Sequence, residues 1–139
     1  MAERKKAIQT AGTRKRAVAR ATIRPGSGRI TMNSKALELV EPKYVRMRLR
    51  EPLMLAPEEL VSKVDVDINV KGGGIWGQVD AARTALANAL VKWSGSKELR
   101  RIYHDYDRTL LVADSRRTEP HKPSRSSAGP RRTKQQSRR

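Results

Sequence analysis

Three glycines in the stretch VKGGGIWGQ, residues 70–78, have the spacing of a nucleotide-binding loop. Gly72, Gly74 and Gly77 satisfy G-x-G-x-x-G, between a stretch typical of a strand and one typical of a helix. In a Rossmann fold this loop holds the pyrophosphate of a dinucleotide at the N-terminus of a helix. That fingerprint belongs to the first βα turn of a βαβ unit, whereas here it follows the last clear strand of the sequence.

The residues around the glycines argue further against a nucleotide cofactor. The acid at the right distance, Glu98, lies in a helical pattern beside Lys97, and Gln78 stands where a P-loop requires lysine. We therefore interpret the glycines as a strand-to-helix turn that needs positive φ angles and close backbone packing. Amides at a helix start attract phosphate in general, and Lys71 adds positive charge, so the loop suits an RNA backbone as well as a cofactor.

Carboxylates and histidines provide no convincing catalytic constellation. Asp65 and Asp67 lie on one face of a predicted strand, where a nuclease would place a metal pair, although such residues are more often the solvated side of the strand. His104 and His121 are far apart and have few acids nearby. The sequence has no cysteine, which excludes disulfides, thiolate metal sites and a cysteine nucleophile. We predict no catalytic residue, no metal and no cofactor.

Aromatic residues are scarce, at 4% of the chain, so a stacking platform of the RNA-recognition-motif kind is not expected. Trp93 lies on an apolar stripe and is expected in the core. Trp76, at the predicted helix start, is available either to stack on a base or to pack internally. Tyr103 and Tyr106 leave the same two alternatives open.

The positive charge of the chain is concentrated at its two ends. Lysine and arginine number 31 against 14 acidic residues, for a formal net charge of +17. Residues 1–24 hold eight basic and one acidic residue and residues 114–139 hold nine and two, so each end carries +7 and the middle only +3. Ends of this kind favour a polyanionic partner, which is bound with release of counterions.

Nucleic acid is the expected polyanion, because the membrane alternatives lack their sequence signals. A membrane-surface helix needs a large apolar face opposite its basic residues, and neither end has one. No apolar run approaches the roughly 18–20 residues of a membrane span. The segment MAERKKAIQTAG has no apolar region of the kind that a secretory signal contains, so we expect a cytoplasmic protein.

The first half of the chain is predicted to contain a hairpin and short helices. The stretch RAVARATI, residues 16–23, alternates so that Arg16 and Arg20 share one face, which predicts a strand with a basic face. Residues 25–28 form a turn, after which residues 29–32 return as the second arm of a hairpin. Residues 35–40 are then predicted to form a short helix capped by Asn33 or Ser34.

The second half is predicted to contain a strand and two helices. The segment 41–62 has Pro42, Pro52 and Pro57 and is expected to form short helical turns rather than one helix. VDVDINV, residues 64–70, alternates strictly and is the clearest strand. Residues 79–93 have helical periodicity. The apolar stripe consists of Val79, Ala82, Leu86, Ala89, Leu90 and Trp93, and the polar residues elsewhere on the helix are Asp80, Arg83, Asn88 and Lys92.

Gly95 is expected to end that helix, and Ser96 to start a shorter one through Tyr103. The order of elements predicts an α+β fold with a small mixed β-sheet packed with helices. Residues 114–139 contain no large aliphatic or aromatic side chain, so we predict an extended tail that is disordered until RNA orders it. The chain is thus divided into a globular RNA-binding domain, residues 1–113, and a basic C-terminal tail, residues 114–139.

Several segments, in order along the chain, resemble the ribosomal protein S9 family of the small subunit, in its archaeal or eukaryotic-like version. GTRKRAVARATIRPGSGRI is similar to the opening strands of the family, and REPLML to its middle segment. VKGGGIWGQVDAARTALANAL is similar to its most distinctive motif, in which three glycines and a glycine–glutamine pair open an alanine-rich helix. Asp114, Arg116 and Glu119 stand where the family has an acid, an arginine and a glutamate, and the ending QSRR is close to the family's endings.

The resemblance implies a ribosomal-S5-domain-2-like fold in the head of the small subunit, where the protein is a structural constituent in contact with ribosomal RNA and neighbouring head proteins. It also implies that the tail runs through RNA toward the peptidyl site. There the terminal Arg139 would reach the phosphates of the tRNA anticodon stem-loop. Residues 120–130, PHKPSRSSAGP, depart from the lysine-rich stretch of many relatives, so the resemblance does not fix their path.

The predicted contact residues lie on the basic strand, at the glycine turn and along the tail. Those predicted to contact ribosomal RNA are Arg14, Lys15, Arg16, Arg20, Lys71, Gly72, Gly73, Gly74, Gln78, Arg116, Arg117, Lys122, Arg125, Arg131 and Arg132, and those predicted to contact tRNA are Lys134, Arg138 and Arg139. No small-molecule substrate is expected. Two alternatives stay open: a non-ribosomal basic nucleic-acid-binding or RNA-chaperone protein, and a nucleotide-dependent or metal-dependent enzyme.

Overall fold

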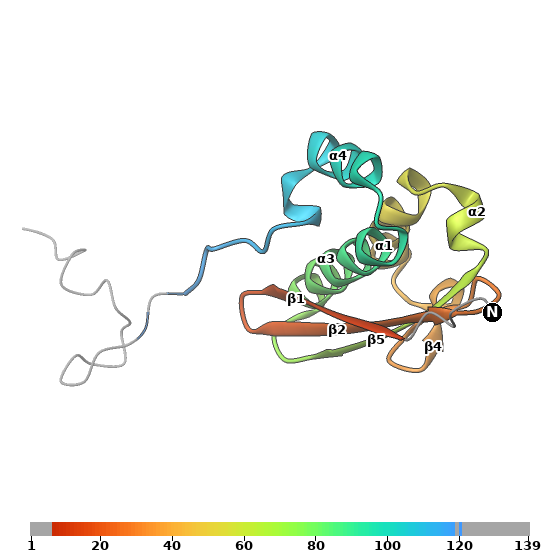
Figure 1. Cartoon of the computed structure of the whole chain (residues 1–139). Coiled ribbons are helices and arrows are strands. Elements are labelled where there is room, and N and C mark those ends of the chain that lie inside the picture. The colour runs from red at the N-terminus through yellow and green to blue at the C-terminus, as the bar shows by residue number, and fades with distance from the viewer. Residues whose placement is uncertain (1–6, 119, 121–139) are drawn as a thin grey trace, which may run out of the picture.

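A computed structural model of the chain describes residues 7–118 and residue 120. Its five strands form one sheet in the order β1-β2-β5-β3-β4, and helices cover one face of it (Figure 1). The strands are β1 (Ile8–Arg14), β2 (Ala17–Pro25), β3 (Ile30–Met32), β4 (Lys35–Ala36) and β5 (Val64–Lys71). The helices are α1 (Lys43–Leu55), α2 (Glu58–Val61), α3 (Ile75–Ser94) and α4 (Lys97–Tyr106), with short 3-10 turns η1 (Leu37–Leu39) and η2 (Arg108–Leu110). The predicted α+β fold is confirmed.

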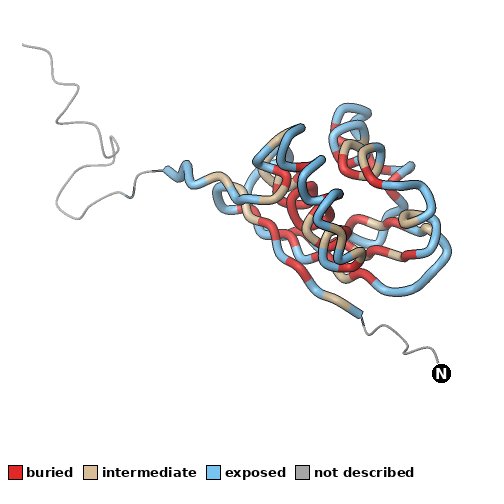
Figure 2. The backbone as a smooth tube through the Cα atoms, turned by 45° about the horizontal axis from the view of Figure 1, so that its top comes forward, coloured by how far each residue is buried: buried red, intermediate tan, exposed pale blue. Residues whose placement is uncertain are grey.

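The sheet is mixed, and its alternating side chains give it one apolar face. Strand β2 pairs antiparallel with β1 and with β5, whereas β3 runs parallel to β5. Figure 2 shows the resulting alternation of buried and exposed residues along the strands. The buried set on β2 and β5 is Ala17, Ala19, Ala21, Ile23, Val64, Val66, Ile68 and Val70. The two central strands were both predicted from this alternation.

Helix α3 lies directly against β1 and β2 because small residues line the contact. On this face of the helix Ala81 and Ala85 are fully buried, and Gly12 of β1 faces them. A Cβ atom on Gly12 would lie 2.2 Å from the carbonyl oxygen of Ala81 and 2.7 Å from the amide nitrogen of Ala85. No side chain fits between the two backbones at this point, so the glycine sets the distance between helix and sheet.

The predicted hairpin between residues 16–23 and 29–32 is wrong. The strand that pairs with β2 on one side is β1, joined to it by a tight turn in which Lys15 has φ 54°. On its other side β2 pairs with β5, which separates it from β3. The long apolar strand β5 gains two neighbours in this central position, and this non-local pairing outweighs the local turn signal of residues 25–28.

The predicted helix over residues 35–40 is also wrong. Residues 35–36 form β4, and only the 3-10 turn η1 follows. Asn33 and Ser34 have φ angles of 49° and 67° and make the turn between β3 and β4. The Asn33 side-chain oxygen accepts a hydrogen bond from the amide of Val70 at 2.9 Å, so this residue fastens the turn to β5 instead of capping a helix.

Residues 43–55 form one helix through Pro52, where short turns were predicted. Pro52 is buried, and its carbonyl oxygen accepts hydrogen bonds from the Tyr103 hydroxyl at 2.6 Å and from the Ala56 amide at 3.2 Å. Tyr103 is fully buried, and its burial raises the pKa of the phenol. Packing and the tyrosine hydrogen bond therefore hold the last turn of α1 in spite of the missing proline amide.

The predicted helix ends around residues 95 and 96 are confirmed. Gly95 follows α3 with φ 64°, and the Ser96 hydroxyl accepts a hydrogen bond from the Leu99 amide at the start of α4. Helix α3 begins at Ile75, earlier than predicted. Trp93 is buried as expected, whereas Trp76 is 60% exposed. Within residues 7–118 no helix has the length and apolarity to cross a membrane.

Candidate nucleic-acid interface

The sheet face that the helices leave open is basic near its centre. Arg20 lies on this face of β2, opposite Asn69 of β5, and Lys71 lies opposite Val18. A hollow of about 940 Å³ includes these residues and also Lys92 from α3 in its lining. Among the described residues, none of Arg20, Lys71 and Lys92 has an acidic partner, so their charges are available to a ligand.

The other end of the same face holds the two strand carboxylates, which serve the fold. Asp65 accepts hydrogen bonds at 2.9 Å from the amides of Ser27 and Arg29, and these bonds lower its pKa. Asp67 accepts from the Thr31 hydroxyl at 2.6 Å and forms an ion pair with Arg24 at 3.1 Å. The described residues contain no group of three side chains suited to hold a metal ion. Both carboxylates therefore hold residues 26–31 against β5 through these hydrogen bonds.

The glycine loop is the predicted strand-to-helix turn. Gly72 and Gly73 have φ angles of 78° and 66°, and a Cβ atom on Gly72 would lie 2.8 Å from the carbonyl oxygen of Arg16. The Gln78 side chain donates a hydrogen bond to the Gly72 carbonyl at 3.1 Å and closes the loop. The first amides of α3 have no acceptor within the helix. The loop thus places these amides and Lys71 beside the β1–β2 turn.

Arg14 differs from its neighbours Lys15 and Arg16 because its side chain points into the protein. Its guanidinium forms ion pairs with Asp114 at 2.6 Å and with Asp80 of α3 at 3.8 Å, and its side chain is 17% exposed. Lys15 and Arg16, which make the turn to β2, are exposed. The basic residues of the turn therefore divide into one that holds the structure and two that face solvent.

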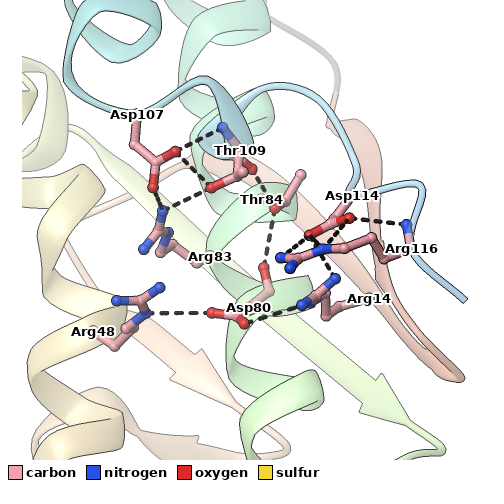
Figure 3. A network of polar contacts seen from close by, with 9 residues as sticks. All are labelled: Arg14, Arg48, Asp80, Arg83, Thr84, Asp107, Thr109, Asp114 and Arg116. Carbon is pink, nitrogen blue, oxygen red and sulfur yellow. Dashed lines mark hydrogen bonds and ion pairs between the residues drawn. The ribbon is translucent and has the colours of Figure 1, made fainter.

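Arg14 belongs to a network of ion pairs that joins helices, sheet and tail (Figure 3). At its centre Arg83 of α3, only 2% exposed, pairs with Glu51 of α1 at 2.7 Å and with Asp107. Burial alone would raise the pKa of Asp107, but hydrogen bonds from Thr109 and Arg83 lower it overall. Arg48 of α1 donates to Asp80 at 3.3 Å. The network fixes α1 and the loop after α4 against α3.

The start of the tail is anchored by the same network. Asp114 accepts hydrogen bonds from the amide and guanidinium of Arg116, which, together with Arg14, hold the pKa of its carboxyl far below the usual range. Arg117 donates to the carbonyl oxygen of Lys15 at 2.7 Å. The segment then leads away from the body of the domain (Figure 1). Arg116 and Arg117 therefore lie at the end of the molecule that carries the β1–β2 turn.

Several residues of this network were not predicted to matter. Asp80 and Arg83 were assigned to the polar side of the helix over residues 79–93. Arg83 nevertheless lies four residues after Val79 and three before Leu86, on the apolar stripe itself. A charged residue at such a position indicates a buried ion pair, which is the signal that was missed. The predicted contacts Lys122, Arg125, Arg131, Arg132, Lys134, Arg138 and Arg139 lie outside the described residues.

Comparisons with known proteins match nearly the whole chain to one protein family. The model of the family described as Ribosomal protein S9/S16 matches residues 12–139. A protein of Methanococcus maripaludis named small ribosomal subunit protein uS9 is 58% identical over 132 residues, which are 95% of this chain and 98% of the relative. A protein of the same name from Methanococcus vannielii is 55% identical over the same shares of the two chains.

Proposed function

Because the chain belongs to the ribosomal protein S9/S16 family and is a protein of the small ribosomal subunit, we propose that it binds small-subunit ribosomal RNA in the head. The contacts are made by the end of the domain at which the β1–β2 turn, the glycine loop and the first tail residues meet. Residues 1–113 act as the RNA-binding domain, and residues 114–139 as a tail ordered on RNA. Arg14 supports this surface from inside, through its ion pairs.

The observation that carries the proposal is the unpaired positive charge of Arg20 and Lys71 on the open sheet face. A cation that already has a carboxylate partner gains little from a phosphate, whereas an unpaired one gains the full contact and releases a counterion. Lys15 and Arg16 extend the same surface to the turn. The α3 amides beyond Gly74 add donors that favour phosphate.

Reversing two of these charges tests the surface. The double substitution R20E/K71E is expected to weaken binding of the full chain to small-subunit ribosomal RNA by about tenfold or more at 0.1 M salt, because two phosphate contacts become repulsions. The slope of log K against log salt should also become less negative by roughly two, because two phosphate contacts are lost. Filter binding across a salt series measures both quantities.

The matched control is K97E/R101E, which changes the net charge by the same amount on the exposed side of α4. It is expected to keep the affinity within about threefold, since these residues lie on a different element from the proposed surface. Equal losses in both variants would show that only the total charge matters, and the assignment of the surface would then be incorrect.

The C-terminal residues are proposed to reach the peptidyl-site tRNA, with Lys134, Arg138 and Arg139 on the phosphates of its anticodon stem-loop. Two observations support this assignment: the family match extends to residue 139, and the anchored start of the tail directs the chain away from the domain. Lys122, Arg125, Arg131 and Arg132 are proposed to follow ribosomal RNA on the way.

Truncation separates the tail from the domain. A chain that lacks residues 134–139 is expected to enter small subunits as the full chain does, because the domain is intact. These subunits should release peptidyl-site tRNA faster, since three cations near its phosphates are lost. The dissociation rate of labelled tRNA from purified subunits measures the effect. Unchanged tRNA release and unchanged reading-frame fidelity would refute the tRNA contact.

A further inference from the structure

Helix α1 has a second apolar face that the domain does not cover. Its inner face packs Val45, Leu49 and Pro52 into the core. The outer stripe consists of Tyr44, Met47 and Met54, with exposed fractions of 71%, 54% and 81%. Positions 44, 47 and 54 follow one another at helical spacing and therefore lie on the same side of the helix.

The start of α3 adds an aromatic side chain to this face. Trp76, 60% exposed, lines a groove of about 550 Å³ together with the outer stripe of α1. Arg48, Arg50 and Glu51 complete its lining. A cluster of large exposed apolar side chains marks an interaction surface, whereas single apolar residues scattered over a surface do not.

We propose that this groove, formed by Tyr44, Met47, Met54 and Trp76, is the docking site of a neighbouring ribosomal protein, which inserts a segment of large apolar side chains flanked by acidic residues. The proposal requires only that the protein works inside the small subunit, and it does not depend on the RNA and tRNA contacts proposed above. Tyrosine, tryptophan and methionine are enriched in protein interfaces, and the flexible thioethers adapt to a partner's side chains.

The charges around the groove specify acidic flanks for the partner segment. Arg50, which lines the groove, has no acidic partner among the described residues, and neither does Lys43, which precedes Tyr44 on α1, so both are free to pair with carboxylates. The single acid of the groove, Glu51, is already bound to Arg83 at 2.7 Å. A partner with apolar anchors and acidic neighbours therefore satisfies both the apolar lining and the unpaired charges.

Other occupants fit less well. A second copy of this chain would bring a net charge of +17 against the same charge. The C-terminal residues 121–139 contain no large aliphatic or aromatic side chain with which to fill the groove. A nucleotide base would stack on Trp76 or Tyr44 but would leave the two methionines exposed, and Arg48 is already engaged by Asp80.

Photo-crosslinking inside assembled subunits tests the proposal. A benzoylphenylalanine replaces Tyr44 or Met54 in the full chain, which is incorporated into small subunits, irradiated and digested for mass spectrometry. We expect both positions to crosslink to one ribosomal protein, within a segment that has apolar and acidic residues. A third chain carries the same probe at Arg20, where the proposed function predicts a crosslink to ribosomal RNA.

The outcomes are distinct for the two proposals. Crosslinks from positions 44 and 54 to RNA, or no crosslinks there while position 20 reacts, would overturn the docking site. Failure at position 20 alone would count against the RNA surface and leave the docking site standing.

A charge variant gives an independent measurement. With the probe at position 44, the pair M47E/M54E is expected to lower the protein crosslink by about tenfold, because the new carboxylates repel acidic flanks and remove the apolar contact. The pair M47L/M54L, which keeps the groove apolar, should retain the crosslink. Both pairs should melt within about 2 °C of the parent chain, since these side chains are exposed. An undiminished crosslink in the glutamate pair would refute the assigned chemistry.

Discussion

Gly12→Ala is expected to lower the free energy of unfolding by about 3 kcal/mol or more, because the added methyl group meets backbone on the opposite element. Its Cβ atom would lie 2.2 Å from the Ala81 carbonyl oxygen and 2.7 Å from the Ala85 amide nitrogen. Neither atom can move away as the end of a flexible side chain does, so α3 must shift from the sheet. Urea unfolding of the full chain, followed by circular dichroism, measures the loss.

Gly74→Ala is the matched control for this substitution. A Cβ atom there meets nothing within 4 Å, and Gly74 has φ −99°, which alanine adopts without strain. We expect a change within about 0.5 kcal/mol. If the two alanines destabilised the protein equally, the close approach of α3 to β1 would not be the cause of the Gly12 effect.

Arg83→Met is expected to cost about 2–4 kcal/mol of unfolding free energy. The methionine fills part of the same space but leaves Glu51 with only its ion pair to Arg48 at 3.9 Å and Asp107 with only its hydrogen bonds from Thr109. Removal of one member of a buried ion pair destabilises a protein by more than the intact pair stabilises it. The two carboxylates keep 25% and 34% exposure, so water offsets part of the loss. Thermal and urea unfolding of the full chain give the value.

An exposed arginine provides the comparison. Arg101 lies on α4 with 84% of its side chain exposed, paired with Asp105 at 3.9 Å. Arg101→Met is expected to change stability by less than about 0.5 kcal/mol, because exposed ion pairs contribute little. A cost for Arg83→Met as small as this would mean that the network in Figure 3 does not hold α1 and the loop after α4 in place.

Local sequence signals were sufficient to predict the strands in which apolar and polar residues alternate and the helix ends that a capping residue marks. The central strands over residues 17–25 and 64–71 follow from period-two patterns, and Gly95 and Ser96 mark the junction of α3 and α4. The interpretation of the glycine loop as a strand-to-helix turn was also correct, because the neighbouring residues argued against a nucleotide-binding loop and glycine permits the positive φ angles of the turn.

The errors arise where distant residues decide the structure. Strand β1 was not predicted, because IQTAGTR is nearly all small or polar, and it becomes a strand by pairing with β2 under α3. Pro52 was expected to break a helix that a distant tyrosine hydroxyl helps to hold. Arg83 was placed on the polar side because its two acidic partners come from positions 32 and 24 residues away.

The strand order has a consequence for the nascent chain. Strand β5 lies between β2 and β3, so the first half of the protein cannot complete its sheet until residue 71 has left the ribosome that makes it. Until then only the β1–β2 and β3–β4 pairs can form, and an isolated two-stranded hairpin is marginal in water. During that interval the basic residues of β1 and β2 lie in a nascent chain without a stable fold, and they are accessible to any RNA nearby. Synthesis of β5 and α3 ends this interval, because these two elements complete the sheet and cover its apolar face, while Lys15, Arg16 and Arg20 stay exposed.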